Sequence, residues 1–187
     1  PKDAVAFAEK IRDPGNHKFT TPSGKIEIYS TGLGENPDPF GLGEISAIPK
    51  WVPHIETSET FPLSMLSSKS RARTHSIHGN QEKLNRVDPD DIWMHPMDAD
   101  PRGIQDGQAV KVMSASGSSI LPVRVTEDIA RGCVSMKEGR WYAPDADGID
   151  REGCANAVTV DTTARCGATT YNTNFVEVRP VNPGPAE

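Results

Sequence analysis

The residue types best suited to chemistry are concentrated in one basic, hydroxyl-rich segment, residues 67–78. It reads Ser-Ser-Lys-Ser-Arg-Ala-Arg-Thr-His-Ser-Ile-His. Small hydroxyl residues leave backbone N–H groups accessible, and arginines make forked contacts with phosphate oxygens. This combination is typical of a site that binds phosphate or pyrophosphate. An ordinary solvated basic loop fits the composition equally well.

The charge of the chain is unevenly distributed. The net charge is −6 over 187 residues, which disfavours general binding to nucleic acid or to an anionic membrane. Residues 69–86 nevertheless hold five basic residues and one acidic residue, so this stretch carries +4 and the remainder −10. A cationic segment in an acidic chain indicates a local anionic partner.

Two possible metal sites are set aside. Asp145-Ala-Asp147-Gly-Ile-Asp150 resembles the start of a calcium loop, but its glycine comes too early and its twelfth position is Asn156. His75 and His78 have the spacing of one helix face, yet the surrounding Ser, Thr and Arg do not favour a helix. We therefore expect a turn-forming acidic loop and hydrogen-bonding histidines.

The cysteines do not form a recognisable site. Cys133, Cys154 and Cys166 are odd in number and include no Cys-x-x-Cys pair, so they are predicted to be reduced structural thiols. The chain has neither a dinucleotide fingerprint after a strand nor a nucleophile elbow. We expect no catalytic residue and no metal ligand.

The elements that position these residues are predicted to be short strands. Gly and Pro number 16 each, which favours turns over long helices. A short helix is predicted at the N-terminus and another, broken by prolines, at 91–102. The pattern is mainly β with short helices, and it predicts a β-barrel. The strands are expected at 25–30, 63–67, 109–114, 120–125, 133–136 and 175–179.

Residues 31–62 are rich in Gly, Pro and Glu and are predicted to form an irregular connector over another surface. Trp51, Val52 and Ile55 would be buried there. The chain starts at Pro1, without an initiator Met or the apolar core of a signal peptide, which indicates a piece of a longer chain. No apolar run approaches the roughly 18 residues of a membrane span.

Taken in order, the motifs resemble the C-terminal molybdopterin dinucleotide-binding domain of the dimethyl sulfoxide reductase family, and most closely its anaerobic catalytic subunits. The resemblance covers most of the chain. The motifs that carry it are Phe19–Ser30, Arg73-Thr-His-Ser76, His95-Pro-Met-Asp-Ala99, Gly103-Ile-Gln-Asp-Gly107, Gly139-Arg-Trp-Tyr142, Gly153-Cys-Ala-Asn156 and Thr173-Asn-Phe-Val176.

The resemblance implies a double-psi β-barrel, of the type also called the aspartate decarboxylase-like barrel. It implies an N-terminal strand and connector at 1–62, the barrel at 63–180 and a tail at 181–187. The implied cofactor is molybdopterin guanine dinucleotide, with molybdenum held by other domains. The residues implied to lie near it are Lys69, Arg73, Thr74, His75, Ser76, Trp141, Tyr142, Asn156, Asn172 and Thr173.

The resemblance also implies a parent enzyme that reduces S-oxides or N-oxides such as dimethyl sulfoxide, of which this chain alone would not be catalytic. Upstream domains, an iron–sulfur electron-transfer subunit and a membrane anchor are the implied partners. An exported or membrane-associated location facing the periplasm is implied, and a cytoplasmic one stays open. The alternatives are a free-standing double-psi barrel that binds a protein partner, and a small self-contained enzyme such as a decarboxylase.

Overall fold

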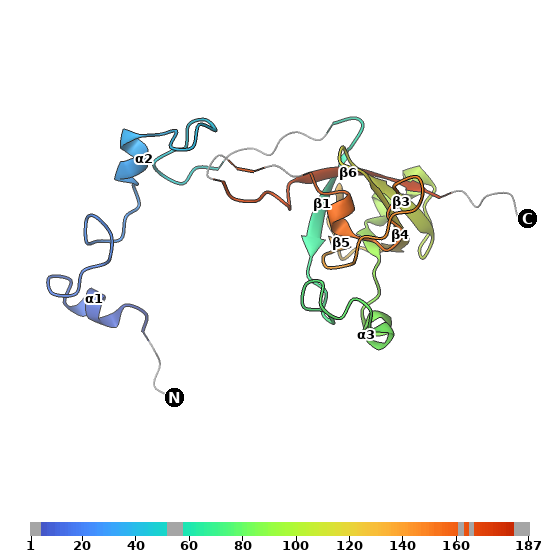
Figure 1. Ribbon diagram of the computed structural model, residues 1–187, viewed down its shortest axis with the longest axis horizontal. Helices are drawn as coiled ribbons and strands as arrows, with labels where there is room; N and C mark the ends of the chain where they lie inside the picture. Colours follow the sequence, from blue (N-terminus) through green and yellow to red (C-terminus); the bar gives the residue numbers. More distant parts are fainter. Residues whose placement is uncertain (1–4, 52–57, 161–162, 165–166, 182–187) are drawn as a thin grey trace, which may run out of the picture. The chain divides into compact units, whose positions relative to one another are not determined.

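A computed structural model describes residues 5–51, 58–160, 163–164 and 167–181 (Figure 1). The chain divides into two compact units. The first comprises Pro1–Val52 with Arg165–Gly167, and the second comprises Pro53–Ala164 with Ala168–Glu187. The second unit holds the strands and the candidate site.

The second unit is a closed barrel whose strands follow the order β1-β5-β2-β4-β3-β6. Two pairs are parallel, β1 with β5 and β2 with β4, and the other four are antiparallel. The parallel pairs require long crossovers, and the loops of the site lie in the connections from β1 to β2, from β3 to β4 and from β5 to β6. The strands are β1 (Leu63–Ser68), β2 (Ile92–Met94), β3 (Ala109–Met113), β4 (Ser118–Val125), β5 (Cys133–Lys137) and β6 (Asn174–Pro180).

The core of the barrel comes from alternate positions of each strand. Met65, Val112 and Met136 are fully buried, and their sequence neighbours on the same strands are more exposed. This is the period of two that a strand with one buried face requires. The five strands predicted between residues 63 and 179 are confirmed, with ends that differ by at most two residues. In β6, Val176 and Val178 reach the core, whereas Phe175 is only half-buried.

One predicted helix was partly wrong. Residues 91–102 begin with the strand β2, and only the second half is helical, as α4 (Pro96–Ala99) and η1 (Asp100–Arg102). Ile92 and Met94 are fully buried between β4 and β5. Three residues are too few for alternation to be read from sequence, and the two prolines favoured a broken helix.

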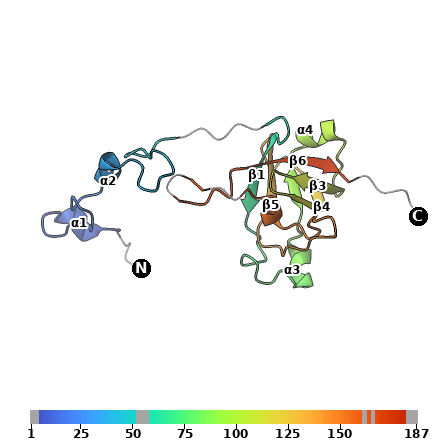
Figure 2. The same ribbon diagram turned by 45° about the horizontal axis from the view of Figure 1, so that its top comes forward.

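Short helices lie outside the barrel wall. In Figure 2, α3 (Glu82–Val87) and α4 lie on opposite sides of the barrel, and η2 (Ala155–Ala157) lies in the long loop that precedes β6. In the part of the chain that the structure describes, no helix is both long and apolar enough to cross a membrane.

The first unit has little regular structure. It contains α1 (Ala8–Arg12) and α2 (Thr31–Glu35), and none of residues 5–51 is buried. The strand predicted at 25–30 does not form: these residues are irregular, and Ile26 and Ile28 are exposed. Alternating apolar and polar residues indicate one apolar face, but a strand forms only when another strand pairs with it. Trp51 is 82% exposed; Val52 and Ile55 lie outside the described residues.

Candidate ligand-binding pocket

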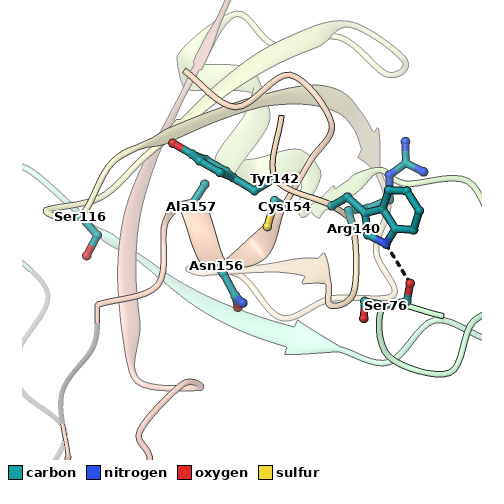
Figure 3. Close-up of a pocket in the computed structure, with 8 residues that line it drawn as sticks. Ser76, Ser116, Arg140, Tyr142, Cys154, Asn156 and Ala157 are labelled. Carbon is teal, nitrogen blue, oxygen red and sulfur yellow. Dashed lines mark hydrogen bonds between the residues drawn. The ribbon is translucent and has the colours of Figure 1, made fainter. Parts of the chain in front are cut away.

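One side of the barrel carries an open hollow of about 660 Å³, which we call the Trp141 pocket. Four of the predicted site residues line it, and they come from three separate segments of the chain. Figure 3 shows Ser116 at one side of the hollow and Arg140 and Ser76 at the other. The full lining is Ser76, Ser116, Arg140, Trp141, Tyr142, Cys154, Asn156 and Ala157.

Two segments far apart in sequence are held together at the wall of the Trp141 pocket. The Trp141 indole Nε1 donates a hydrogen bond of 2.9 Å to the Ser76 carbonyl oxygen (Figure 3). Gly139 packs so closely against the same segment that a Cβ at this position would lie 2.0 Å from the His75 carbonyl oxygen. His75 itself has a φ of 51°, a conformation uncommon outside glycine. The local backbone is therefore set by contact with residues 139–141.

Substituting Gly139 tests that close approach. Gly139→Ala adds a backbone clash and strain at a φ of 94°, and we expect about 3 kcal/mol less free energy of unfolding. Gly148→Ala is the matched control, because Gly148 has a φ of 76° but open space around its Cβ position; it isolates the strain at about 1 kcal/mol. Urea unfolding of both variants gives the comparison. Equal losses would contradict the close packing.

Asp150, which is fully buried, joins a loop that lines the Trp141 pocket to the barrel. Its Oδ2 accepts hydrogen bonds from Ser119 Oγ at 2.6 Å and the Cys154 N–H at 2.7 Å, and its Oδ1 accepts one from the Ala143 N–H at 3.0 Å. Ser119 lies on β4, and the other two donors lie beside the lining residues Tyr142 and Asn156. The carboxylate thus fixes the pocket loop to the strand.

A second carboxylate, Asp90, is largely buried at 11% side-chain exposure and joins two arginines. Arg73 Nη1 and Nη2 lie 2.9 and 2.5 Å from its oxygens, and Arg140 Nε lies 3.2 Å from Asp90 Oδ2. Arg140 also pairs with Glu152 and donates to the Gly79 carbonyl oxygen at 2.9 Å. The Arg73 side chain has no exposed surface. Arg73, predicted to lie near cofactor groups, instead joins residues 70–79 to the rest of the site.

Asp88 anchors the start of the basic segment to β5. It accepts hydrogen bonds from Ser70 Oγ at 2.7 Å and the Arg71 N–H at 2.8 Å, and its Oδ1 lies 2.9 Å from Lys137 Nζ. Burial acts to raise the pKa of Asp88, but the bonds from Ser70, Lys137 and Arg71 together lower it from 3.8 to about 2. The carboxylate is therefore charged at any physiological pH.

The lowered pKa of Asp88 predicts an acid-sensitive contribution to stability. A carboxyl group with a depressed pKa in the folded state stabilises fully above its unfolded pKa, and this contribution is lost as the pH falls from about 4 toward 2. The carboxylate is partly solvated, so we expect about 1 kcal/mol. Urea unfolding should show the gap between wild type and Asp88→Asn shrinking by that amount from about pH 5 to about pH 2.5. A gap that stays constant would contradict the assignment.

Lys69 and His75, two other predicted site residues, meet one carboxylate. Lys69 Nζ lies 2.8 Å and His75 Nδ1 lies 3.1 Å from the same oxygen, Glu138 Oε1. Thr74 is exposed and forms an isolated bridge with Ile77. None of these three residues lines the pocket, but Thr74 and His75 come directly before the lining residue Ser76 in the sequence.

Asn172 and Thr173 have structural contacts outside the Trp141 pocket. Asn172 Oδ1 accepts a hydrogen bond of 2.9 Å from the Ser67 N–H, at the end of β1. The Thr173 N–H donates to the Thr170 carbonyl oxygen at 2.8 Å. Asn172 thereby fixes the strand from which the basic segment begins, and neither residue lines the pocket.

Sequence reasoning missed four lining residues: Ser116, Arg140, Cys154 and Ala157. Ser116 lies in the predicted β3–β4 turn, which approaches the loop around Ala157, since a Cβ at Gly117 would lie 2.7 Å from the Ala157 carbonyl oxygen. Burial raises the pKa of the Cys154 thiol, and the Asp150 carboxylate adds to that effect. Cys154 is therefore a neutral part of the wall.

The acidic loop that resembled a calcium site is stabilised internally. Asp145 Oδ1 accepts hydrogen bonds of 2.9 Å from the Asp147 and Ile149 N–H groups, and Asp145 Oδ2 pairs with Arg151. The bonds from Ile149 and Arg151 lower the pKa of Asp145. Among the described residues, no group of three His, Cys, Asp or Glu side chains is arranged to hold a metal ion.

Known proteins and one protein family are similar to this chain over more than half of its length. Residues 63–175 match the family model described as "Molydopterin dinucleotide binding domain". The chain is 37% identical over 163 residues to "Dimethyl sulfoxide reductase DmsA" of Haemophilus influenzae, covering 83% of this chain and 20% of the relative. The protein of the same name from Escherichia coli K12 is 33% identical over 186 residues, with 95% and 23% covered.

Two further likenesses extend the comparison. "Trimethylamine-N-oxide reductase" of Haemophilus influenzae is 33% identical over 172 residues, covering 86% of this chain and 20% of the relative. The solved structure of acetylene hydratase from Pelobacter acetylenicus matches 90% of this chain and 25% of that one, with a TM-score of 0.74 at 18% identity. With the closed barrel, this likeness confirms the predicted double-psi fold. The chain spans about a fifth of the length of the curated relatives it matches.

Proposed function

The chain belongs to the molybdopterin dinucleotide-binding domain family, as its motifs predicted, and from this premise we propose that it binds molybdopterin guanine dinucleotide in the Trp141 pocket. We further propose that it does so as the C-terminal domain of a longer molybdenum oxidoreductase that reduces S-oxides or N-oxides. The observation that carries the proposal is the lining of the pocket. Its two exposed aromatic side chains, one amide and two hydroxyls face one hollow on a rigid barrel.

The lining fits the chemistry of a dinucleotide. Trp141 and Tyr142 are 54% and 58% exposed, so their rings are available to stack on a planar heterocycle. Asn156 is exposed and offers both a donor and an acceptor to a purine or pterin edge. Ser76 and Ser116 offer hydroxyls from opposite sides. No carboxylate belongs to the lining, so nothing in it repels a pyrophosphate.

The predicted residues take different parts in this proposal. Ser76, Trp141, Tyr142 and Asn156 contact the ligand directly, Lys69 supplies positive charge at the edge, and His75 supplies an imidazole nitrogen beside it. The remaining members, Arg73, Thr74, Asn172 and Thr173, position the segments that carry those contacts. Arg140, bound to Asp90 and Glu152, joins this positioning group.

The chemistry of the parent enzyme belongs to the cofactor. Molybdopterin dinucleotide, with the molybdenum that other domains hold, supplies the two-electron redox chemistry, and the protein supplies binding and orientation. Upstream domains, an iron–sulfur electron-transfer subunit and a membrane anchor are proposed as partners. A periplasm-facing location is proposed with them. The chain matches about a fifth of the length of relatives that are named as reductases. This partial match supports a domain of a larger enzyme over a free-standing binding module.

Guanosine diphosphate, which carries the guanosine and the pyrophosphate of the cofactor, is the probe that tests the pocket. Isothermal titration should show binding to the chain that weakens about tenfold in Trp141→Leu and about fivefold in Asn156→Ala, from lost stacking and lost hydrogen bonds. Trp51→Leu is the matched control, because Trp51 is an exposed tryptophan of the first unit. Binding that is absent in the wild type, or unchanged in both pocket variants, would overturn the proposal.

A further inference from the structure

The contact among Lys69, His75 and Glu138 differs in kind from the other ion pairs of the site. The Lys69 and His75 side chains are largely exposed, at 70% and 69% of their surface. The pairs Arg73–Asp90 and Lys137–Asp88 are largely buried, with side-chain exposures of 0% and 11%, and 9% and 13%. Buried pairs of this kind are fixed parts of a fold, whereas exposed pairs are weak and exchange readily. The Glu138 contact is therefore the one suited to open.

The backbone around Glu138 is held on both sides. The Glu138 N–H donates to the Ser68 carbonyl oxygen at 2.9 Å, directly after β5, and the next residue, Gly139, packs against the His75 carbonyl oxygen. Lys69 and His75 both converge on the single oxygen Oε1. An exposed ammonium and an exposed imidazole that share one carboxylate oxygen have the arrangement of an anion-binding pair.

This pair borders the Trp141 pocket. His75 is adjacent in sequence to Ser76, and Glu138 lies two residues before Arg140; both Ser76 and Arg140 line the hollow. The arginines of the site are already bound to Asp90 and Glu152. Lys69 is thus a positive group, and His75 a polar one, that can turn toward an incoming anion near the pocket.

We propose that Lys69 and His75 form an anion subsite at the edge of the Trp141 pocket, and that Glu138 occupies this subsite as an internal competitor. A phosphoryl group of the ligand displaces the carboxylate, because it carries more charge and more acceptor oxygens. Glu138 then lowers the affinity for the ligand by competing with it and by repelling it. This inference rests on the proposed function, since it assigns one part of the same site.

The test uses inorganic pyrophosphate and guanosine diphosphate as probes in isothermal titration. Glu138→Gln should bind both probes about three- to tenfold more tightly than the wild type, the size of effect expected of a weak exposed ion pair. Lys69→Met should weaken binding and should abolish the gain when combined with Glu138→Gln. Glu82→Gln is the control for net charge, because it removes one carboxylate from the exposed Glu82–Arg86 pair and should leave both affinities unchanged.

The outcomes separate this inference from the proposed function. If Glu138→Gln binds the probes more weakly than the wild type or equally well, Glu138 positions Lys69 and His75 and the competitor role is wrong. The proposed function stands in that case if binding still depends on Trp141. An equal gain in Glu82→Gln would reduce the effect to net charge and overturn the subsite. If no variant binds guanosine diphosphate, the proposed function fails together with the inference.

Discussion

Replacing Asp90 with alanine should lower the free energy of unfolding by about 3–5 kcal/mol, because the buried Arg73 guanidinium would lose its counter-charge. Arg73 has no exposed side-chain surface, and both of its terminal nitrogens bond to Asp90. Arg140 would lose one of its two carboxylate partners in the same variant. We expect the Trp141 pocket to lose guanosine diphosphate affinity as well, since Asp90 joins two of its walls.

A double-mutant cycle in urea separates the pair from its surroundings. Arg73→Met combined with Asp90→Ala should recover much of the loss, because an apolar side chain replaces an unpaired buried charge. Glu82→Ala is the exposed control, with both partners of its pair more than 80% exposed, and it should cost less than about 0.5 kcal/mol. Losses for Asp90→Ala as small as those of Glu82→Ala would show that the buried pair contributes nothing.

Replacing Asp150 with alanine should cost about 4 kcal/mol, because three donors would lose one charged acceptor. The Ser119 hydroxyl and the Cys154 N–H lie in buried residues and have no access to water in exchange. The loop that carries Tyr142 and Asn156 should then loosen, while the backbone of residue 150 keeps its hydrogen bonds to Ser118 and Ile120 of β4. Fluorescence-monitored urea unfolding measures the stability, and titration with guanosine diphosphate measures the pocket.

Asp147→Ala is the matched control for Asp150→Ala. Asp147 is exposed on the same loop, so its removal should change stability by less than about 0.5 kcal/mol. A stability for Asp150→Ala within about 1 kcal/mol of the wild type would contradict the anchoring role. A stable Asp150→Ala that still binds guanosine diphosphate normally would further show that the pocket does not depend on this tie.

The strands that sequence predicted well share a physical cause. β3, β4, β5 and β6 have alternating β-branched or apolar residues between glycine-containing turns, so the period of two is visible in the sequence itself. β2 has only three residues, and its assignment depends on the two neighbours that pair with it. The alternation at 25–30 predicted a strand, but a strand also needs a partner, and pairing is a property of the whole fold.

The residues that line the site could be grouped from the sequence, but the ion pairs among its charged residues could not. Ser76, Trp141, Tyr142 and Asn156 line one hollow, and the motifs had grouped them. The sequence did not predict that the Arg73 side chain turns inward to Asp90. A basic segment and the acidic run Asp88-Pro89-Asp90-Asp91 are both visible in the sequence, yet which cation turns inward is decided by the fold around β5. Lys69 and His75 kept exposed positions, and Arg73 did not.

We propose that the ligand binds in the Trp141 pocket. The same barrel also carries an alternative location for a ligand. A second hollow of about 650 Å³ is lined by Pro101, Arg102, Glu177, Val178, Arg179 and Pro180. Its arginine at position 102 is bound to Glu177, and its lining includes no aromatic residue. A binding experiment that reports position therefore distinguishes the two.

The most direct measurement is amide chemical-shift mapping by nuclear magnetic resonance, with the ¹⁵N-labelled chain titrated with guanosine diphosphate. We expect saturable shifts of the Ser76, Trp141 and Asn156 amides and of the Trp141 indole N–H, and no shifts at residues 177–179. Shifts confined to residues 177–179 and Arg102, or no saturable shift at the Trp141 pocket, would contradict ligand binding in that pocket.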